Sequence, residues 1–248
     1  MSKPSVARMK LIYRLGWHAW RTFYWYFFRW KIYHVERVPV DGGVILASNH
    51  ASFLDPPLVG TAVPREINYL ARESLFHWPI FGWLIRQWNS VPVDRDGGGA
   101  AGLKAILNRL KKGGAIIMFP EGTRTHDGQL QPARSGIGLA VIKSKVPVVP
   151  ARIFGSFEAY SRHMLIPRFL IREMAVKYAE PMDFKELRAE AKTCSKERLK
   201  EIYQEVADQL SSCRAPNATG GEEEEAGTVD ARMSYFQEDE SRDLDAPD

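Results

Sequence analysis

Residues 45–57 read ILASNHASFLDPP, and this stretch indicates the fold class. A short apolar run leads directly into Asn49, His50, Ser52 and Asp55. Such an order is typical of α/β folds, which present their chemistry at the ends of buried strands. Asp55 could accept a hydrogen bond from one ring nitrogen of His50, which would leave the other nitrogen free to take a proton.

The same residues also allow a purely structural interpretation. Asp55 directly before Pro56 is a common way to begin a helix, with the carboxylate as the cap and proline in the first turn. A histidine at a strand end is often simply hydrogen-bonded. This segment alone therefore leaves catalysis and capping open.

A second apolar run ends in a cluster that suits an anionic ligand. Residues 115–125 read AIIMFPEGTRT, so a buried strand is expected to run into Glu121, Gly122, Thr123 and Arg124. A glycine lets the backbone approach a ligand closely, a threonine offers a hydroxyl, and arginine offers a bidentate fork suited to phosphate. A turn that carries a surface arginine is the alternative.

Between residues 33 and 212, short apolar runs alternate with helical patterns, which predicts an α/β fold. We expect a mostly parallel or mixed central sheet of about seven strands covered by helices. The expected strands are Tyr33–Val38, Gly43–Ala47, Ile67–Ala71, Ser90–Val93, Ala115–Phe119, Val146–Ile153 and Glu173–Tyr178. The expected helices are 56–63, 79–89, 98–112, 136–145 and 183–212, the last as one broken helix or two successive ones.

Charge divides the 248 residues into three parts. Residues 1–35 carry +7, residues 36–214 carry +6, and residues 215–248 carry −9. We therefore expect a basic front segment (1–35), one catalytic domain (36–213) and an acidic, disordered tail (214–248). The two cysteines, Cys194 and Cys213, have no metal-binding spacing, which argues against a disulfide scaffold or a zinc finger and favours a reducing compartment.

The front segment predicts an amphipathic helix at a membrane surface. Residues 11–33 read LIYRLGWHAWRTFYWYFFRWKIY, and their longest stretch without Lys, Arg or His is the seven residues 22–28. That is too short for a membrane span, and no signal-peptide pattern is present. Trp, Tyr and Arg favour the membrane interface. A span and a helix packed on the protein's own core remain alternatives. On a helical wheel the basic face holds Lys10, Arg14, His18, Arg21 and Arg29, and the opposite face holds Ile12, Gly16, Trp20, Phe23, Phe27 and Trp30.

Several blocks in order resemble the glycerolipid acyltransferase family, in particular the 1-acyl-sn-glycerol-3-phosphate acyltransferases. Its N-H-x-S-x-x-D motif is matched by residues 49–55 and its F-P-E-G-T-R motif by residues 119–124. Arg72, Leu75 and Phe76 match a K/R-x-x-L-F pattern, residues 91–95 match V-P-V-D-R, and residues 146–151 match V-P-V-x-P-x. Where the family often has F-K-x-G, residues 133–136 read ARSG, which keeps the cation as Arg134 and lacks the aromatic.

The resemblance implies roles for individual residues. It makes His50 the general base and Asp55 the residue that orients it, and it places Glu121, Gly122, Thr123 and Arg124 at the acceptor's phosphate, with Arg72 assisting. The implied reaction moves a fatty acyl group from acyl-CoA or an acyl carrier protein to lysophosphatidic acid, giving phosphatidic acid for phospholipid biosynthesis. It implies a peripheral protein on the cytoplasmic face of a membrane that uses no cofactor, metal or nucleic acid.

The sequence has no Ser or Cys in a G-x-S-x-G setting, which favours direct attack over a covalent acyl-enzyme. Three other functions remain open. The acceptor could be a different lysolipid, the chain could be a lipid hydrolase in which His50 activates water, or it could bind membrane lipid without catalysis.

Overall fold

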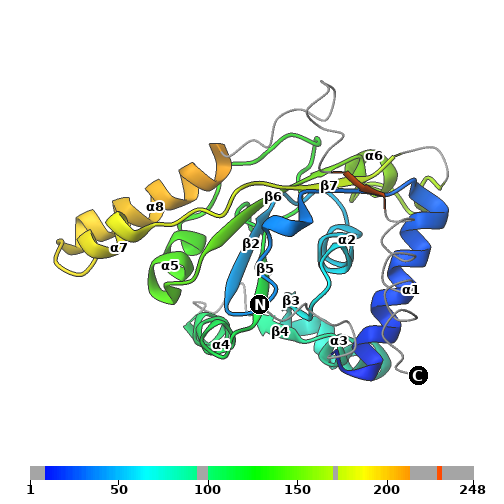
Figure 1. Ribbon diagram of the computed structural model, residues 1–248, viewed down its shortest axis with the longest axis horizontal. Coiled ribbons are helices and arrows are strands. Elements are labelled where there is room, and N and C mark those ends of the chain that lie inside the picture. The colour runs from blue at the N-terminus through cyan, green and yellow to red at the C-terminus, as the bar shows by residue number, and fades with distance from the viewer. Residues whose placement is uncertain (1–8, 94–99, 170–172, 213–227, 231–248) are drawn as a thin grey trace, which may run out of the picture.

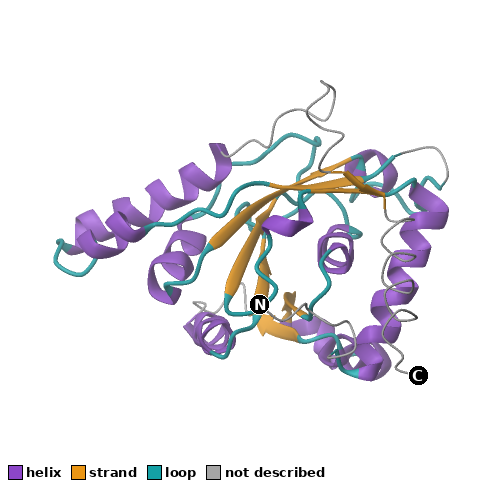
Figure 2. Ribbon diagram, viewed as in Figure 1, coloured by secondary structure: helices purple, strands orange, loops and turns teal. Residues whose placement is uncertain are grey.

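The computed structural model describes residues 9–93, 100–169, 173–212 and 228–230. These residues form an eight-stranded mixed sheet with helices on both of its faces, as Figures 1 and 2 show. The strands are β1 (Lys31–Tyr33), β2 (Val44–Ser48), β3 (Ile67–Arg72), β4 (Ser90–Val93), β5 (Ala115–Met118), β6 (Val148–Phe154), β7 (Ala175–Tyr178) and β8 (Thr228–Asp230). The α-helices are α1 (Leu11–Phe28), α2 (Asp55–Ala62), α3 (Pro79–Gln87), α4 (Ala100–Lys111), α5 (Ser135–Ser144), α6 (Ser156–Tyr160), α7 (Lys185–Glu190) and α8 (Lys196–Ser212), and the 3₁₀ helices are η2 (Val35–Arg37) and η3 (Glu73–His77).

The strand order is β4-β3-β5-β2-β6-β7-β1-β8. The first five strands are parallel, so their carboxyl ends lie at one edge, which we call the carboxyl edge. β7 runs antiparallel to β6, and β1 pairs parallel with β7. The predicted α/β class and mixed sheet are therefore confirmed.

The sheet separates two hydrophobic cores, and the alternation of side chains along β2 explains both. Val44 and Leu46 point into the core under α1 and α2, whereas Ile45 and Ala47 point into the core under α4, α5 and α8. A strand covered on both faces needs apolar residues at every position, so β2 reads as a continuous apolar run. This burial fixes β2 at the centre of the sheet and sets the position of the residues that follow it.

Two predicted boundaries at the front of the chain are wrong. α1 ends at Phe28 because Arg29 adopts a left-handed conformation with φ of 42°, so the helix does not continue to residue 33. The strand expected at Tyr33–Val38 begins earlier and is shorter, since β1 covers Lys31–Tyr33 and residues 35–37 form η2. Of the expected disordered tail, Thr228–Asp230 pairs antiparallel with β1, and the tail's other residues lie outside the described part of the chain.

The predicted front helix is present, and its aromatic side packs on the protein. Trp30 is buried, while Trp20, Phe23 and Phe27 pack against the core under α2. The exposed large side chains of α1 are instead Leu11, Ile12, Leu15, Trp25 and Tyr26. Among the helices of the described residues, none combines the length and apolarity that crossing a bilayer requires.

Three hydrogen bonds hold α1 against α2. The Trp17 indole N–H donates to the Val63 carbonyl at 3.1 Å, and the Arg21 guanidinium donates to the Thr61 carbonyl at 3.0 Å. The Tyr24 hydroxyl donates to the Leu54 carbonyl at 2.8 Å, directly before the first residue of α2. The front helix is therefore part of the fold that supports α2.

Candidate active site

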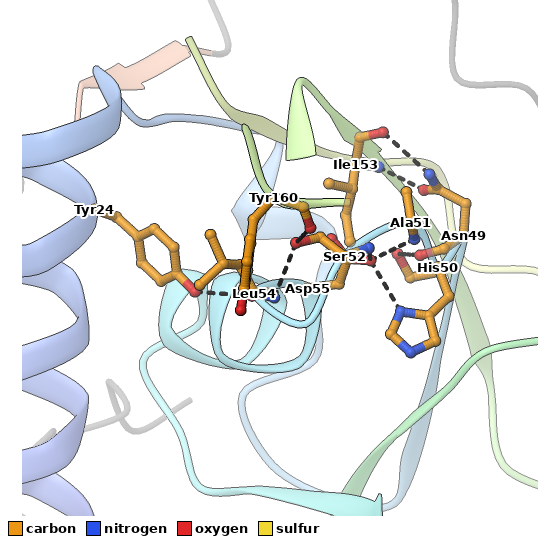
Figure 3. A network of polar contacts seen from close by, with 10 residues as sticks. Tyr24, Asn49, His50, Ala51, Ser52, Leu54, Asp55, Ile153 and Tyr160 are labelled. Carbon is orange, nitrogen blue, oxygen red and sulfur yellow. Dashed lines mark hydrogen bonds and ion pairs between the residues drawn. The ribbon is translucent and has the colours of Figure 1, made fainter. Parts of the chain in front are cut away.

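The His50–Asp55 pair lies at the carboxyl edge (Figure 3). β2 ends at Ser48 and delivers His50 two residues later, and Asp55 is the first residue of α2. His50 Nδ1 lies 2.9 Å from Asp55 Oδ2. The Asp55 side chain is fully buried, whereas the His50 side chain keeps 13% of its surface exposed. The predicted pair is therefore formed, with its histidine as the accessible member.

Backbone N–H groups stabilise the carboxylate of Asp55. Oδ2 accepts hydrogen bonds from the N–H groups of Ala51 at 2.5 Å and Ser52 at 2.6 Å. A negative charge at the first turn of a helix is also favoured by the helix dipole. Because an ionised carboxylate can only accept, Nδ1 of His50 is the donor, and Nε2 of the neutral ring is left with a lone pair. The geometry therefore suits His50 to take up a proton at Nε2.

The other two polar residues of the first motif hold the loop. The Asn49 amide pairs with the backbone of Ile153 on β6, donating to its carbonyl at 3.2 Å and accepting from its N–H at 2.7 Å. Ser52 is buried, and its hydroxyl donates to the Tyr160 carbonyl at 2.7 Å and accepts from the Leu54 N–H at 3.1 Å. A buried serine with both roles occupied is poorly placed to act as a nucleophile.

The second motif holds His50 from the opposite side. The Phe119 ring stacks on the imidazole with 4.0 Å between centroids and 16° between planes. The Thr125 N–H donates to the His50 carbonyl at 2.9 Å, and the Glu121 carboxylate interacts with the His50 backbone N–H. Residues 119–125 therefore position His50 through both its ring and its backbone.

Glu121 is only 5% exposed. Burial raises the pKa of Glu121 from 4.5 to about 7, although backbone N–H groups of His50 and Gln131 and the charge of Arg152 act to lower it. A carboxylate in this position would repel a phosphate and is well placed to brace the His50 loop. The acceptor-binding role expected for Glu121 stays a prediction.

The next three residues along the chain after Glu121 are Gly122, Thr123 and Arg124. Gly122 has φ of 70°, and a Cβ there would lie 3.0 Å from the Arg134 side chain, so glycine suits both the backbone and the close approach. The Arg124 guanidinium carbon lies 3.4 Å from the centroid of the Phe53 ring, which is 55% exposed. Arg124 thus connects the two motif loops, while Thr123 is half-buried.

Arg72 is exposed at the end of β3, also at the carboxyl edge. The hydrogen bonds that hold His50 and Asp55 do not include its side chain. Its part in binding the acceptor therefore stays a prediction. Asp94 and Arg95, which complete the V-P-V-D-R block, lie outside the described residues.

A mostly apolar cavity of about 560 Å³ begins at His50. Phe119, which stacks on the imidazole, and Gly122 line it, together with residues of α4 and α5 and of strands β3, β4 and β5. The apolar residues that line it farther from the histidine include Val93, Leu103, Ile106 and Leu139. The site therefore combines a proton acceptor with a space suited to an apolar chain.

Across the described residues, no cluster of three or more His, Cys, Asp or Glu side chains has the arrangement of a metal site. That the reaction uses no metal or cofactor stays a prediction, as does the absence of a nucleic-acid partner.

Sequence reasoning missed the stacking of Phe119 on His50 and the contact of Tyr24 with the catalytic loop. The position of Phe119 at the end of a strand that neighbours β2 was a usable signal for the first. Nothing in the spacing of residues 24 and 54 indicates the second.

Comparisons with known proteins agree with this geometry. The family model described as acyltransferase matches residues 29–154, which contain both motif loops. The 1-acyl-sn-glycerol-3-phosphate acyltransferase of Bacillus subtilis is 32% identical over 126 residues, or 50% of this chain and 62% of that protein. A chloroplast enzyme of the same name from Brassica napus is 32% identical over 52% of this chain and 38% of its own length. The chain therefore covers less than two thirds of these two relatives.

A solved structure extends the likeness to most of the chain. The crystal structure of the 1-acyl-sn-glycerophosphate acyltransferase from Thermotoga maritima matches with a TM-score of 0.61 and 27% sequence identity. The match covers 84% of this chain and 80% of that one. Most of this chain therefore has the same overall fold as that structure.

Proposed function

The chain belongs to the acyltransferase family, and from this membership and the His50–Asp55 geometry we propose that it transfers a fatty acyl group from a thioester to the 2-hydroxyl of lysophosphatidic acid, giving phosphatidic acid. The observation that carries the proposal is the contact of the His50 imidazole with the buried Asp55 carboxylate. Nδ1 lies 2.9 Å from Asp55 Oδ2, and the other ring nitrogen of His50 points away from the hydrogen-bond network (Figure 3).

In the proposed reaction, His50 Nε2 removes the proton of the acceptor's hydroxyl as the oxygen attacks the thioester carbonyl. The imidazolium that forms is stabilised by the carboxylate of Asp55. Collapse of the tetrahedral intermediate breaks the carbon–sulfur bond, forms the ester and releases the thiol, which takes up the proton from His50. The buried, doubly hydrogen-bonded Ser52 supports this direct transfer over an acyl-serine intermediate.

Binding of both substrates follows from the surroundings of His50. We assign the acyl chain to the apolar cavity beside the imidazole, since its wall matches hydrocarbon. We assign the acceptor's phosphate to Arg124, with Gly122 and Thr123 beside it and Arg134 close by. The donor is acyl-CoA or acyl carrier protein, and the protein acts as a peripheral protein on the cytoplasmic face of a membrane.

The experiment is a transfer assay with the purified full chain. Lysophosphatidic acid and other lysophospholipids are offered with acyl-CoA or acyl carrier protein as donor, and products are identified by mass. Phosphatidic acid as the main product supports the proposal. Preferred acylation of another lysolipid overturns the assigned acceptor.

Release of free fatty acid without an acceptor would instead identify a hydrolase. A chain that binds the lipids and turns over none of them would be a non-catalytic binding protein. The His50→Ala variant is the negative control for turnover, because it should keep the fold and lacks the proposed proton acceptor.

A further inference from the structure

The exposed large apolar side chains of the described residues are concentrated in a few segments. The thirteen such residues lie on α1, on the loop at Phe53, on residues 75–83 and on residues 165–166. Monomeric proteins rarely expose contiguous apolar patches without a function. The segment at 75–83 carries as many of these residues as α1 over half the length, and no role in catalysis accounts for it.

We call the exposed apolar side of η3 and α3 the α3 surface. It consists of Leu75, Trp78, Ile80, Phe81 and Trp83, which are 38, 69, 83, 46 and 51% exposed. The opposite side of the segment packs normally, since Phe76, Gly82 and Ile85 are buried. A Cβ on Gly82 would lie 2.4 Å from the Phe76 carbonyl oxygen, so α3 lies directly on η3. The exposed residues therefore belong to an ordered helix.

Charge indicates what this surface meets. After the exposed Glu73 that begins η3, residues 74–88 contain no Asp or Glu and carry Arg86 and His77. The exposed part of α1 has the same character, because residues 10–34 contain no acid. Tryptophan on an apolar face with few acids is typical of contact with anionic lipid head groups and the acyl boundary beneath them.

The α3 surface also adjoins α1. Trp88, the residue after α3, places its ring 6.2 Å from that of Trp20 and packs against Gly16. Figure 1 shows α3 beside the N-terminal half of α1. The two helices thus present neighbouring apolar segments to the outside.

Sheet topology connects the α3 surface to the site. η3 begins directly after β3, at the carboxyl edge where the loops of His50 and Phe119 also begin. Phe53 and residues 165–166 follow β2 and β6, whose carboxyl ends lie at the same edge. Apolar exposure is therefore found on three connections that leave the catalytic edge.

We propose that the α3 surface is the principal docking element for an anionic lipid bilayer, with the exposed side of α1 as a secondary contact. The proposal rests on the proposed function only in that a lipid acceptor would be drawn from this bilayer. It differs from an interface formed by the aromatic face of the front segment, since Trp20, Phe23 and Phe27 of α1 and Trp30 after it pack on the protein.

The first test measures binding to vesicles by sedimentation, without any need for turnover. Trp78→Ser combined with Ile80→Ser should weaken binding to phosphatidylcholine–phosphatidylglycerol vesicles by about tenfold or more, because two large apolar side chains no longer leave water. Lys196→Ser combined with Lys200→Ser on α8 is the control for a loss of two surface charges. Leu11→Ser combined with Leu15→Ser compares α1 and should have the smaller effect.

Unchanged binding of the Trp78/Ile80 variant would overturn the proposal, as would a larger loss in the Leu11/Leu15 variant. A dimer that dissociates in the Trp78/Ile80 variant while vesicle binding stays intact would overturn it in favour of a second copy of the chain. Activity on a short-chain, water-soluble lysophosphatidic acid separates the two proposals. That activity should survive in the variant, and its absence in the parent chain would count against the proposed function alone.

The second test reports insertion at a single position. In a chain with Cys194→Ser and Cys213→Ser, an environment-sensitive dye on Ile80→Cys should brighten when vesicles are added and be quenched by brominated lipid. The same dye on Lys200→Cys should not respond. Equal responses at both positions, or no response at position 80, would contradict docking through the α3 surface.

Discussion

The loop at residues 49–55 and the segment at residues 75–83 both follow a parallel strand at the carboxyl edge. The first buries polar side chains, whereas the second exposes apolar ones. The first buries Asp55 and Ser52 and satisfies them with backbone groups. The second exposes Trp78 and Ile80. Each departs from the usual preference of polar residues for water and apolar residues for the interior. The two proposals assign different tasks to this one edge, proton transfer in its interior and contact with hydrocarbon at its rim.

The largest expected effect is the loss of the base from the buried side of this comparison. His50→Ala should lower kcat by about 10²-fold or more with the fold intact, because general-base help contributes 10²–10⁴-fold. Turnover with lysophosphatidic acid is measured beside the circular dichroism spectrum. His163→Ala, an exposed histidine, is the matched control. Near-full activity of the His50 variant would show that another group removes the proton.

Asp55→Asn should lower kcat in the same direction and by about tenfold to hundredfold, since the imidazole loses the acceptor that fixes its tautomer. The amide can still accept from the Ala51 or Ser52 N–H, so folding should be retained. The pH dependence of kcat is measured with the parent and the variant. Identical profiles at equal rates would contradict the role of Asp55 in orienting His50.

Arg124→Lys should raise the acceptor KM by about tenfold and change the donor KM less, because lysine keeps the charge and loses the bidentate fork. It also weakens the stacking of the guanidinium on Phe53. Steady-state kinetics with each substrate varied in turn gives both constants, and Arg162→Lys is a control at an exposed arginine. An unchanged acceptor KM in a folded variant would remove Arg124 from the phosphate site.

Glu121→Gln should change how stability depends on pH. Burial raises the pKa of Glu121 from 4.5 to about 7, so the folded chain holds this proton more tightly than the unfolded chain. The contribution of Glu121 to the free energy of unfolding is therefore complete below about pH 4.5 and is lost as the pH rises through about 7. Glutamine cannot ionise, and the variant's free energy of unfolding should therefore fall less over this range, by on the order of 2–3 kcal/mol.

Denaturant unfolding at several pH values measures this difference. Glu158→Gln, at an exposed position, provides the control and should leave the parent's pH dependence unchanged. Parallel curves for the parent and the Glu121 variant would show that this carboxyl does not titrate in the expected range.

The smallest expected effect concerns neither side of the comparison. A chain that ends at Arg214 loses β8 and its pairing with β1, far from His50 in the strand order. It should keep its activity and show a thermal midpoint only a few degrees lower, because three residues are removed from an edge of the sheet. Loss of the thermal transition would contradict a dispensable tail.

The centre of the fold and the catalytic pair were predictable because their signals are local. β2 and β5 are apolar runs, and polar residues follow β2 directly and follow β5 after Phe119 and Pro120. Asp55 is the first residue of α2, the N-cap is Leu54, and no side chain caps this helix by a hydrogen bond, so the capping interpretation is wrong, whereas the expected contact of Asp55 with His50 is formed. The sequence could not separate these two interpretations because a carboxylate directly before proline suits both a helix cap and a partner for the histidine.

The orientation of α1 could not be predicted from its helical wheel. The wheel separates a basic face from an aromatic one and does not say which meets the protein. Arg21 stacks on Trp17 and Trp30 and donates to the Thr61 carbonyl, so a cation lies on the packed side. The end of α1 was missed for a related reason, since Arg29 takes a left-handed conformation that glycine more often adopts.

The hydrogen bond from Tyr24 to the Leu54 carbonyl affects how deletion experiments are interpreted. Removing residues 1–28 is an obvious way to obtain a protein that no longer adheres to lipid. The shortened chain would also lose the Tyr24 hydroxyl that donates to the carbonyl before Asp55. It would lose the hydrogen bonds from the Trp17 indole and the Arg21 guanidinium to the far end of α2 as well. An inactive shortened chain would therefore not demonstrate a need for membrane attachment. Point substitutions on the outer surface separate attachment from catalysis, because they leave this support in place.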